Sequence, residues 1–72
     1  MSAPGMWANI ATAARKRCHD YRTTRRIILG FEMEMRQAEG EAAREGLQLV
    51  LRELREYLAN TWPEGIEAER GA

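Results

Sequence analysis

The sequence predicts an all-α protein, a helical hairpin or small three-helix unit that self-associates into a helical bundle. Three observations favour this fold. Apolar residues recur at spacings of three and four in two long runs. Residues that interrupt helices gather in an N-terminal extension (1–5), at Gly40 and at 63–65, and so bound those runs. The whole chain of 72 residues forms one small domain, which buries little of its own surface.

The second run is the clearer one and predicts a helix over residues 41–62. Acidic residues gather in its first turns, where the helix dipole favours them. Pro63 stops this helix, and residues 63–72 follow as an acidic C-terminal tail. The residues that share one face of the helix are Ala43, Leu47, Val50, Leu51, Leu54, Tyr57, Leu58, Thr61 and Trp62.

The first helical region covers residues 6–38. As one helix it would be about 50 Å long, against about 33 Å for the second, so Trp7 and Ile10 would extend past their partner. Either the chain breaks near residues 19–24 and gives three helices, or another subunit covers the overhang. The apolar side carries Met6, Ile10, Arg17, Tyr21, Thr24, Ile28, Phe31 and Met35. Arg17 is the charged exception, and we expect its stem to pack while its guanidinium reaches water.

Residues 27–35 also permit a short strand that pairs across a dimer. Apolar and acidic residues alternate there, in the order Phe31, Glu32, Met33, Glu34 and Met35. Gly30 would also weaken a helix, by about 1 kcal/mol relative to alanine. The helix is nevertheless the preferred interpretation, because Tyr21, Ile28 and Met35 continue its register at intervals of seven.

A chain of this size needs a further source of stability, since apolar burial and conformational entropy nearly cancel. Cys18 is the only cysteine, so a disulfide could only link two subunits. Cys18 and His19 are too few to hold a structural zinc ion, and no metal is expected. We therefore predict a homodimer. The residues expected in its interface or core are Tyr21, Ile28, Phe31, Met35, Leu47, Val50, Leu51, Leu54, Tyr57, Leu58 and Trp62.

The net charge is zero but unevenly distributed. Residues 1–31 carry six basic residues and one acid, a net charge of +5, whereas residues 32–72 carry five basic residues and ten acids, a net charge of −5. In an antiparallel assembly the basic half of one chain can lie along the acidic half of another and set its orientation.

The basic half contains the stretch RKRCHDYRTTRR, residues 15–26. On a continuous helix its cations form a row that could follow a phosphate backbone. The candidate nucleic-acid-binding residues are Arg15, Lys16, His19, Arg22 and Arg26. However, no Asn or Gln stands beside them to read base edges, and Tyr21 lies on the apolar side. We interpret the row first as the solvated face of a helix, with nucleic-acid binding as the alternative.

Nothing in the sequence indicates an enzyme. The side chains of Cys18 and His19 point about 100° apart on a helix and cannot pair. There is no glycine-rich phosphate loop, and no acid precedes His19 by three or four residues, as the di-metal sites of helical bundles require. We therefore expect no catalytic residue and no cofactor.

The predicted function is that of a small regulatory or interaction protein, an inhibitor or adaptor that binds a macromolecule through a helical surface. Its expected partners are a second copy of itself and another protein, with nucleic acid as the alternative. The candidate protein-binding residues are Trp7, Ile10, Leu29 and Met33. An anionic membrane surface, anchored by Met6, Trp7 and Ile10, is the least favoured partner.

The expected location is the cytoplasm. No segment has the composition of a secretory signal or of a membrane span. Residues 1–31 resemble a transit peptide in being rich in Arg and poor in acids, but their removal would leave too few residues to fold alone.

Overall fold

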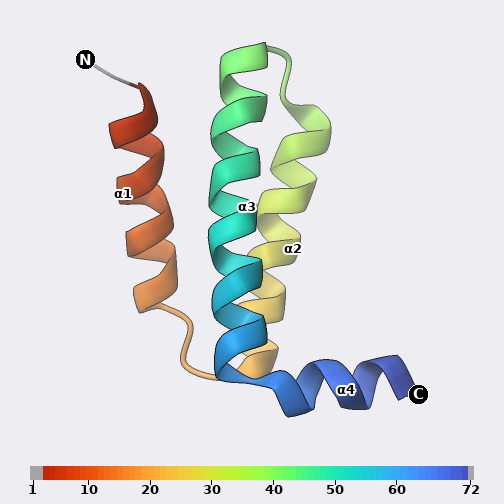
Figure 1. The fold of residues 1–72 in the computed structure, drawn as a ribbon. Helices are drawn as coiled ribbons and strands as arrows, with labels where there is room; N and C mark the ends of the chain where they lie inside the picture. The colour runs from red at the N-terminus through yellow and green to blue at the C-terminus, as the bar shows by residue number, and fades with distance from the viewer. Residues whose placement is uncertain (1–2, 72) are drawn as a thin grey trace.

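The computed structural model describes residues 3–71 and places most of them in helices, with no strand in that range. The helices are α1 (Ala3–Lys16), α2 (Tyr21–Gln37), α3 (Glu41–Thr61) and α4 (Pro63–Gly71), as Figure 1 shows. The predicted all-α fold is confirmed. The strand considered for residues 27–35 is excluded, because α2 runs through all of them.

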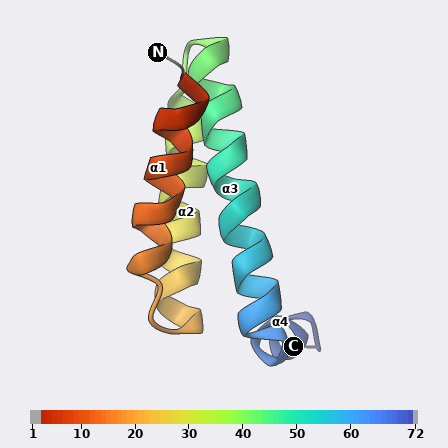
Figure 2. The same cartoon turned by 60° about the vertical axis from the view of Figure 1, so that its left-hand side comes forward.

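The helix α3 is the centre of the fold. It packs against α1 on one flank and α2 on the other, whereas α1 and α2 scarcely touch each other. The helices α1 and α3 run in the same direction, and α2 runs opposite to both (Figures 1 and 2). The short α4 turns away across the end of the bundle where α2 begins. The result is an open arrangement in which α3 holds two helices apart.

The hydrophobic core lies where α1 and α2 meet α3. Val50 and Leu54 of α3 and Ile28 of α2 are almost completely buried, and small residues of α1 allow it to approach closely. The buried apolar residues are Ala11, Ala14, Cys18, Ile28, Leu47, Val50, Leu51, Leu54 and Leu58. Residues that we expected in a dimer interface or core thus lie within the core of one chain, with Tyr21, Phe31, Met35, Tyr57 and Trp62 half-buried around it.

The first helical region is broken at residues 17–20, at the early edge of the range where a break was expected. Asp20 has an extended backbone, and its carboxylate accepts a 2.7 Å hydrogen bond from the Thr23 backbone N–H. This is a helix N-cap, which satisfies one of the free N–H groups at the start of α2. Thr24 is buried, and its hydroxyl donates to the Asp20 carbonyl over 2.7 Å. Asp20 therefore begins a new helix, and α1 folds back beside α3.

Gly40 and Pro63 mark the two later boundaries. Gly40 stands at the start of α3, after a short connection from α2. Pro63 ends α3 as expected, but it also occupies the first position of α4, where its missing N–H costs nothing. The segment described from sequence as an acidic tail is helical over residues 63–71. Tyr21 packs against Gly65 of this helix and donates a 2.7 Å hydrogen bond to Glu69 Oε1.

The core predicts a large effect at Leu54, whose side chain is fully buried. We expect Leu54→Ala to lower the free energy of unfolding by about 2–5 kcal/mol, because it removes apolar burial and leaves a cavity. Urea denaturation followed by circular dichroism measures this change. Gln48→Ala, at an exposed position of the same helix, is the matched control and should change the value by less than about 0.5 kcal/mol. Equal effects at the two positions would contradict the described core.

The Asp20 cap predicts a specific response to acid. Its hydrogen bonds from Thr23 lower the pKa of the Asp20 carboxyl below its ordinary value of 3.8. Because the pKa of the folded state lies below that of the unfolded state, the charged cap stabilises the fold fully above pH 3.8 and loses this contribution as the pH falls through the lowered pKa.

The variant Asp20→Asn keeps a capping side chain but removes its titration. We expect the difference in free energy of unfolding between wild type and Asp20→Asn to shrink as the pH falls below 3.8. Asp20→Ala, which removes the cap itself, should be the least stable of the three at neutral pH. Urea denaturation over a series of pH values measures these differences, and a constant gap between wild type and Asp20→Asn would refute the prediction.

Candidate protein-binding surfaces

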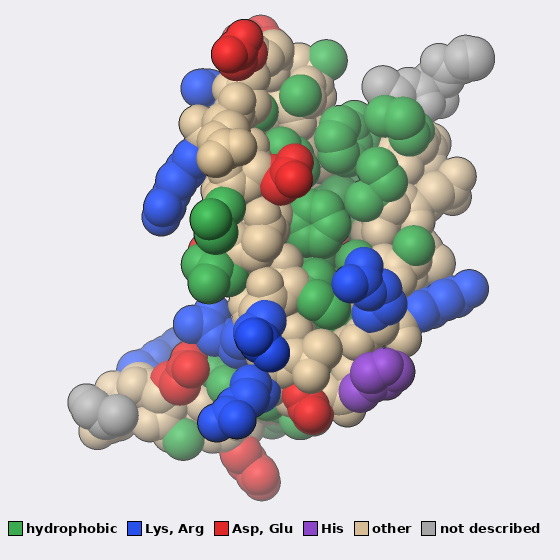
Figure 3. All heavy atoms as spheres, turned by 180° about the vertical axis from the view of Figure 1, so that it is seen from behind, with side chains coloured by type: hydrophobic (Ala, Val, Ile, Leu, Met, Phe, Trp, Pro, Cys, Tyr) green, Lys and Arg blue, Asp and Glu red, His purple; other side chains and the backbone are tan. Residues whose placement is uncertain are grey.

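The first surface is a groove between α1 and α2, which we call the α1–α2 groove. It consists of two hollows that share Phe31 and Glu34. The residues that line it are Trp7, Ile10, Arg17, Thr23, Arg26, Ile27, Gly30, Phe31, Glu34, Gln37, Ala38, Ala43 and Leu47. Seen from behind, apolar side chains gather between the two helices (Figure 3). The groove exists because α3 separates α1 from α2 and nothing in residues 3–71 fills the gap.

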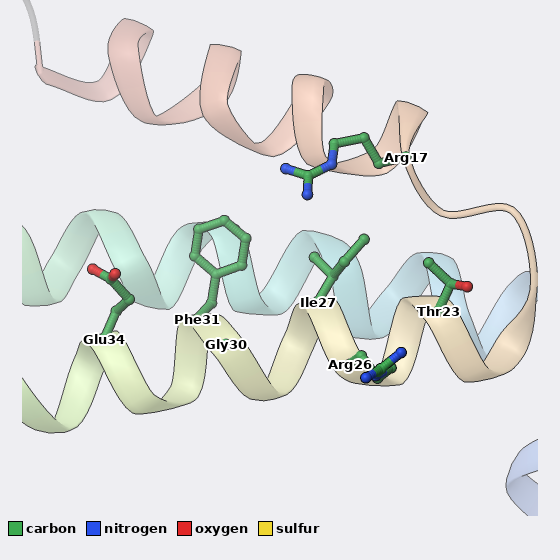
Figure 4. A pocket seen from close by; sticks show the side chains of 7 residues that line it. All are labelled: Arg17, Thr23, Arg26, Ile27, Gly30, Phe31 and Glu34. Carbon is green, nitrogen blue, oxygen red and sulfur yellow. The ribbon is translucent and has the colours of Figure 1, made fainter.

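The hollow of this groove that Arg17 and Glu34 line has an apolar middle and charged ends. Figure 4 shows Thr23, Ile27 and Phe31 projecting from α2 toward α1, while the Arg17 guanidinium lies above them. Glu34 projects into the same space from farther along α2. Among the described residues, neither Arg17 nor Glu34 has an ion-pair partner. Cationic and anionic groups are thus available at opposite ends of an apolar strip.

The second surface is the outer side of α2, where Leu29 and Met33 are 52% and 50% exposed. Leu29 also lines a hollow between α2 and α4. The residues around this hollow are Tyr21, Arg22, Arg25, Arg26, Leu29, Glu32 and Glu69. Arg25 is paired with Glu69 at 3.4 Å and Glu32 is paired with Arg55, whereas Arg22 and Arg26 have no ion-pair partner within the described part of the chain.

Trp7 and Ile10 are half-buried and take part in the packing of the chain itself. The indole of Trp7 lies directly against Gly46 of α3, so close that a Cβ atom at position 46 would collide with its ring. Ile10 is half-buried and packs against the core beside it. Both residues help to attach α1 to α3. Of the four candidate protein-binding residues, Leu29 and Met33 are therefore the two left largely exposed.

The basic residues do not form the single row that a continuous helix would produce. Arg15 is on α1, where it pairs with Glu53 at 3.9 Å and lies over the Tyr57 ring. His19 lies in the connection, and Arg22 and Arg26 follow on α2 after the break. Lys16 ends α1 and is exposed. The candidate nucleic-acid-binding residues are thus divided between two helices and a turn.

Ion pairs within the chain join its basic and acidic halves. Arg15 contacts Glu53, and Arg25 contacts Glu69. These side chains are about half exposed, so each pair contributes little to stability. The hydrogen bond to Glu69, followed by burial and the charge of this carboxylate, raises the pKa of Tyr21 above its ordinary value of 10.0. Some of the basic residues of the N-terminal half are therefore paired with acidic residues of the C-terminal half within one copy.

The described residues contain no arrangement of His, Cys, Asp and Glu side chains that could share a metal ion. Cys18 is buried, and its thiol lies 3.4 Å from the Ala14 carbonyl oxygen as a hydrogen-bond donor. It is a free cysteine that packs in the core rather than on the surface. No helix within residues 3–71 is both long enough and apolar enough to cross a bilayer.

Comparison with protein-family models, with curated proteins and with solved structures gives no significant match to this chain.

The contact between Trp7 and Gly46 predicts that a single methyl group will disturb the attachment of α1. An alanine in a helix interior is ordinarily more stable than glycine by about 1 kcal/mol. At position 46 the methyl group would displace the indole, and we expect Gly46→Ala to lower the free energy of unfolding by about 1–3 kcal/mol. In a Trp62→Phe background, the fluorescence of Trp7 should also shift to longer wavelength.

Gly30→Ala is the matched control, because a Cβ atom at position 30 meets nothing within 4 Å in the same chain. In dilute protein this change should raise the free energy of unfolding by up to about 1 kcal/mol. If Gly46→Ala stabilised the protein as Gly30→Ala does, the described contact with Trp7 would be wrong.

Proposed function

We propose that the protein is a non-enzymatic interaction protein, an inhibitor or adaptor, that binds another protein through the outer side of α2. The observation that carries this proposal is the half-exposed pair Leu29 and Met33 on a helix whose other side is buried against α3. Large apolar side chains that gather on a small surface are typical of protein-binding sites. The two residues lie four apart, so they stand together on one face of the helix.

The charges beside this pair define the kind of partner. Arg22 and Arg26 stand at the rim of the hollow that contains Leu29, without an ion-pair partner among residues 3–71. A guanidinium group binds carboxylates through two parallel hydrogen bonds. We propose as the partner segment an amphipathic helix whose apolar side chains cover Leu29 and Met33 while its acidic side chains face Arg22. The cytoplasmic location expected from the sequence stays a prediction.

Nucleic-acid binding is the weaker alternative. The exposed cations Lys16 and Arg22 support it, but they lie on different helices rather than in one row. Tyr21 lines the same hollow as Arg22, but its ring packs against Gly65 and its hydroxyl donates to Glu69, so the ring is not presented to a base. Such a surface would give only weak attraction to phosphates that falls steeply with salt.

The proposal predicts that Leu29→Ser combined with Met33→Ser will abolish partner binding and leave the fold intact, since both side chains are half exposed. Tagged protein is recovered from its native cells after cross-linking, and co-purified proteins are quantified by mass spectrometry. We expect the double variant to lose at least about nine-tenths of the specific partner, a cost of roughly 1.4 kcal/mol or more. Gln48→Ser combined with Arg52→Ser, at exposed positions of α3, is the control and should retain it.

A parallel mobility-shift titration with DNA and RNA tests the alternative. We expect no binding at low salt. Salt-sensitive binding that Lys16→Glu with Arg22→Glu abolishes, together with unchanged protein recovery by the Leu29 and Met33 variant, would overturn the proposal in favour of nucleic acid.

A further inference from the structure

The α1–α2 groove is a second surface, on the side of α2 that faces α1. The helices α1 and α2 pack against α3 but scarcely touch each other. The groove between them therefore lies where a fourth helix could pack. Its apolar lining, with Ile27 and Phe31 half-buried and in contact with the core, is incompletely covered by the chain itself. A helix of matching pattern would complete the bundle.

The wall that α2 contributes to this groove is self-complementary. Arg26, Gly30 and Glu34 line the groove at intervals of four residues, on one stripe of the helix. Arg26 and Glu34 therefore stand at equal distances, about 6 Å along the axis, on either side of Gly30. When two such helices lie antiparallel and cross at Gly30, the arginine of each lies level with the glutamate of the other.

Gly30 suits the crossing point. A Cβ atom built there would meet nothing within 4 Å, so the bare backbone of α2 faces open space at the middle of the stripe. A position without a side chain allows another backbone to approach closely. A glycine at this position makes the isolated helix less stable than an alanine would, by about 1 kcal/mol. No contact within the described chain explains why a glycine is present.

Arg17 strengthens the same pattern from the opposite wall. It lines the hollow that contains Arg26, and its guanidinium lies over the groove in Figure 4. A glutamate entering at that end would meet two guanidinium groups, Arg17 and Arg26, neither of which has an ion-pair partner among the described residues. Charge complementarity thus selects a partner whose acidic end points toward Arg17, as the α2 helix of a second copy does.

We propose that the occupant of the α1–α2 groove is the α2 helix of a second copy, in a two-fold dimer whose axis passes near Gly30. Each copy inserts its α2 into the groove of the other, so that Arg26 and Arg17 of one copy meet Glu34 of the other at both ends. Ile27 and Phe31 are covered in the middle. Leu29, which lines the hollow on the α4 side of the same helix, stays free for the partner proposed above.

Charge reversal tests this arrangement in a way that no other occupant reproduces. Sedimentation equilibrium should give twice the 8.3 kDa mass of one chain for the wild type. Arg26→Glu alone and Glu34→Arg alone each place like charges together, and we expect either to weaken the dimer by about tenfold or more. Mixing the two single variants restores both pairs and should give heterodimers, and the double variant Arg26→Glu with Glu34→Arg should form dimers again.

The position of the axis has its own test. In a Cys18→Ala background, Gly30→Cys should form a disulfide-linked dimer under mild oxidation, because residue 30 faces its own copy across the axis. Gly71→Cys, at the far end of α4, is the control and should stay largely unlinked. Circular dichroism confirms that each variant is folded.

A wild-type chain that stays monomeric up to millimolar concentration overturns the dimer. A dimer that the charge swaps do not weaken and restore, or that links through position 71 rather than 30, overturns this mode of association. Neither result bears on binding through Leu29 and Met33, which is measured by recovery of a different protein.

Discussion

The structure depends on the packing of two helices against the single central helix α3. Leu54, Val50 and their neighbours present an apolar surface broad enough to contact α1 and α2 together. This gives one chain a core, because the apolar sides of three helices share the same buried residues. The same arrangement leaves α1 and α2 without extensive contact with each other. Because α1 and α2 pack on different flanks of α3 and scarcely touch each other, a groove lies between them.

Much of the fold could be predicted from the spacing of apolar residues. The run of leucines in α3 has the helical period throughout, and Pro63 marks its end, so its bounds differ from the expected ones by one residue. The break after α1 was harder to locate, since it depends on one Asp20 side chain that caps α2. The helical state of residues 63–71 was missed because few apolar residues mark it, and contacts of Tyr21 with Gly65 and Glu69 hold it in place.

The candidate surfaces were less accessible to sequence reasoning, because they depend on which helices become neighbours. Trp7 looked like an overhanging side chain as long as α1 and α2 were treated as one helix. The Trp7 ring packs against Gly46. Nothing in the sequence distinguishes Gly46 from any other glycine in a helix. The exposure of Leu29 and Met33 was expected, since they fall away from the apolar face of α2. The groove could not be foreseen, because it belongs to no single helix.

The pairing of α1 with α3 has a consequence during synthesis. Trp7 leaves the ribosome well before Gly46, against which it packs, and at the usual rates of translation the interval is about 2–8 s. The helices α2 and α3, joined by a short connection, can assemble as soon as both have emerged. The nascent α1 must wait with its apolar side uncovered until that hairpin exists. Chaperones that shield emerging chains would therefore meet this protein chiefly along α1.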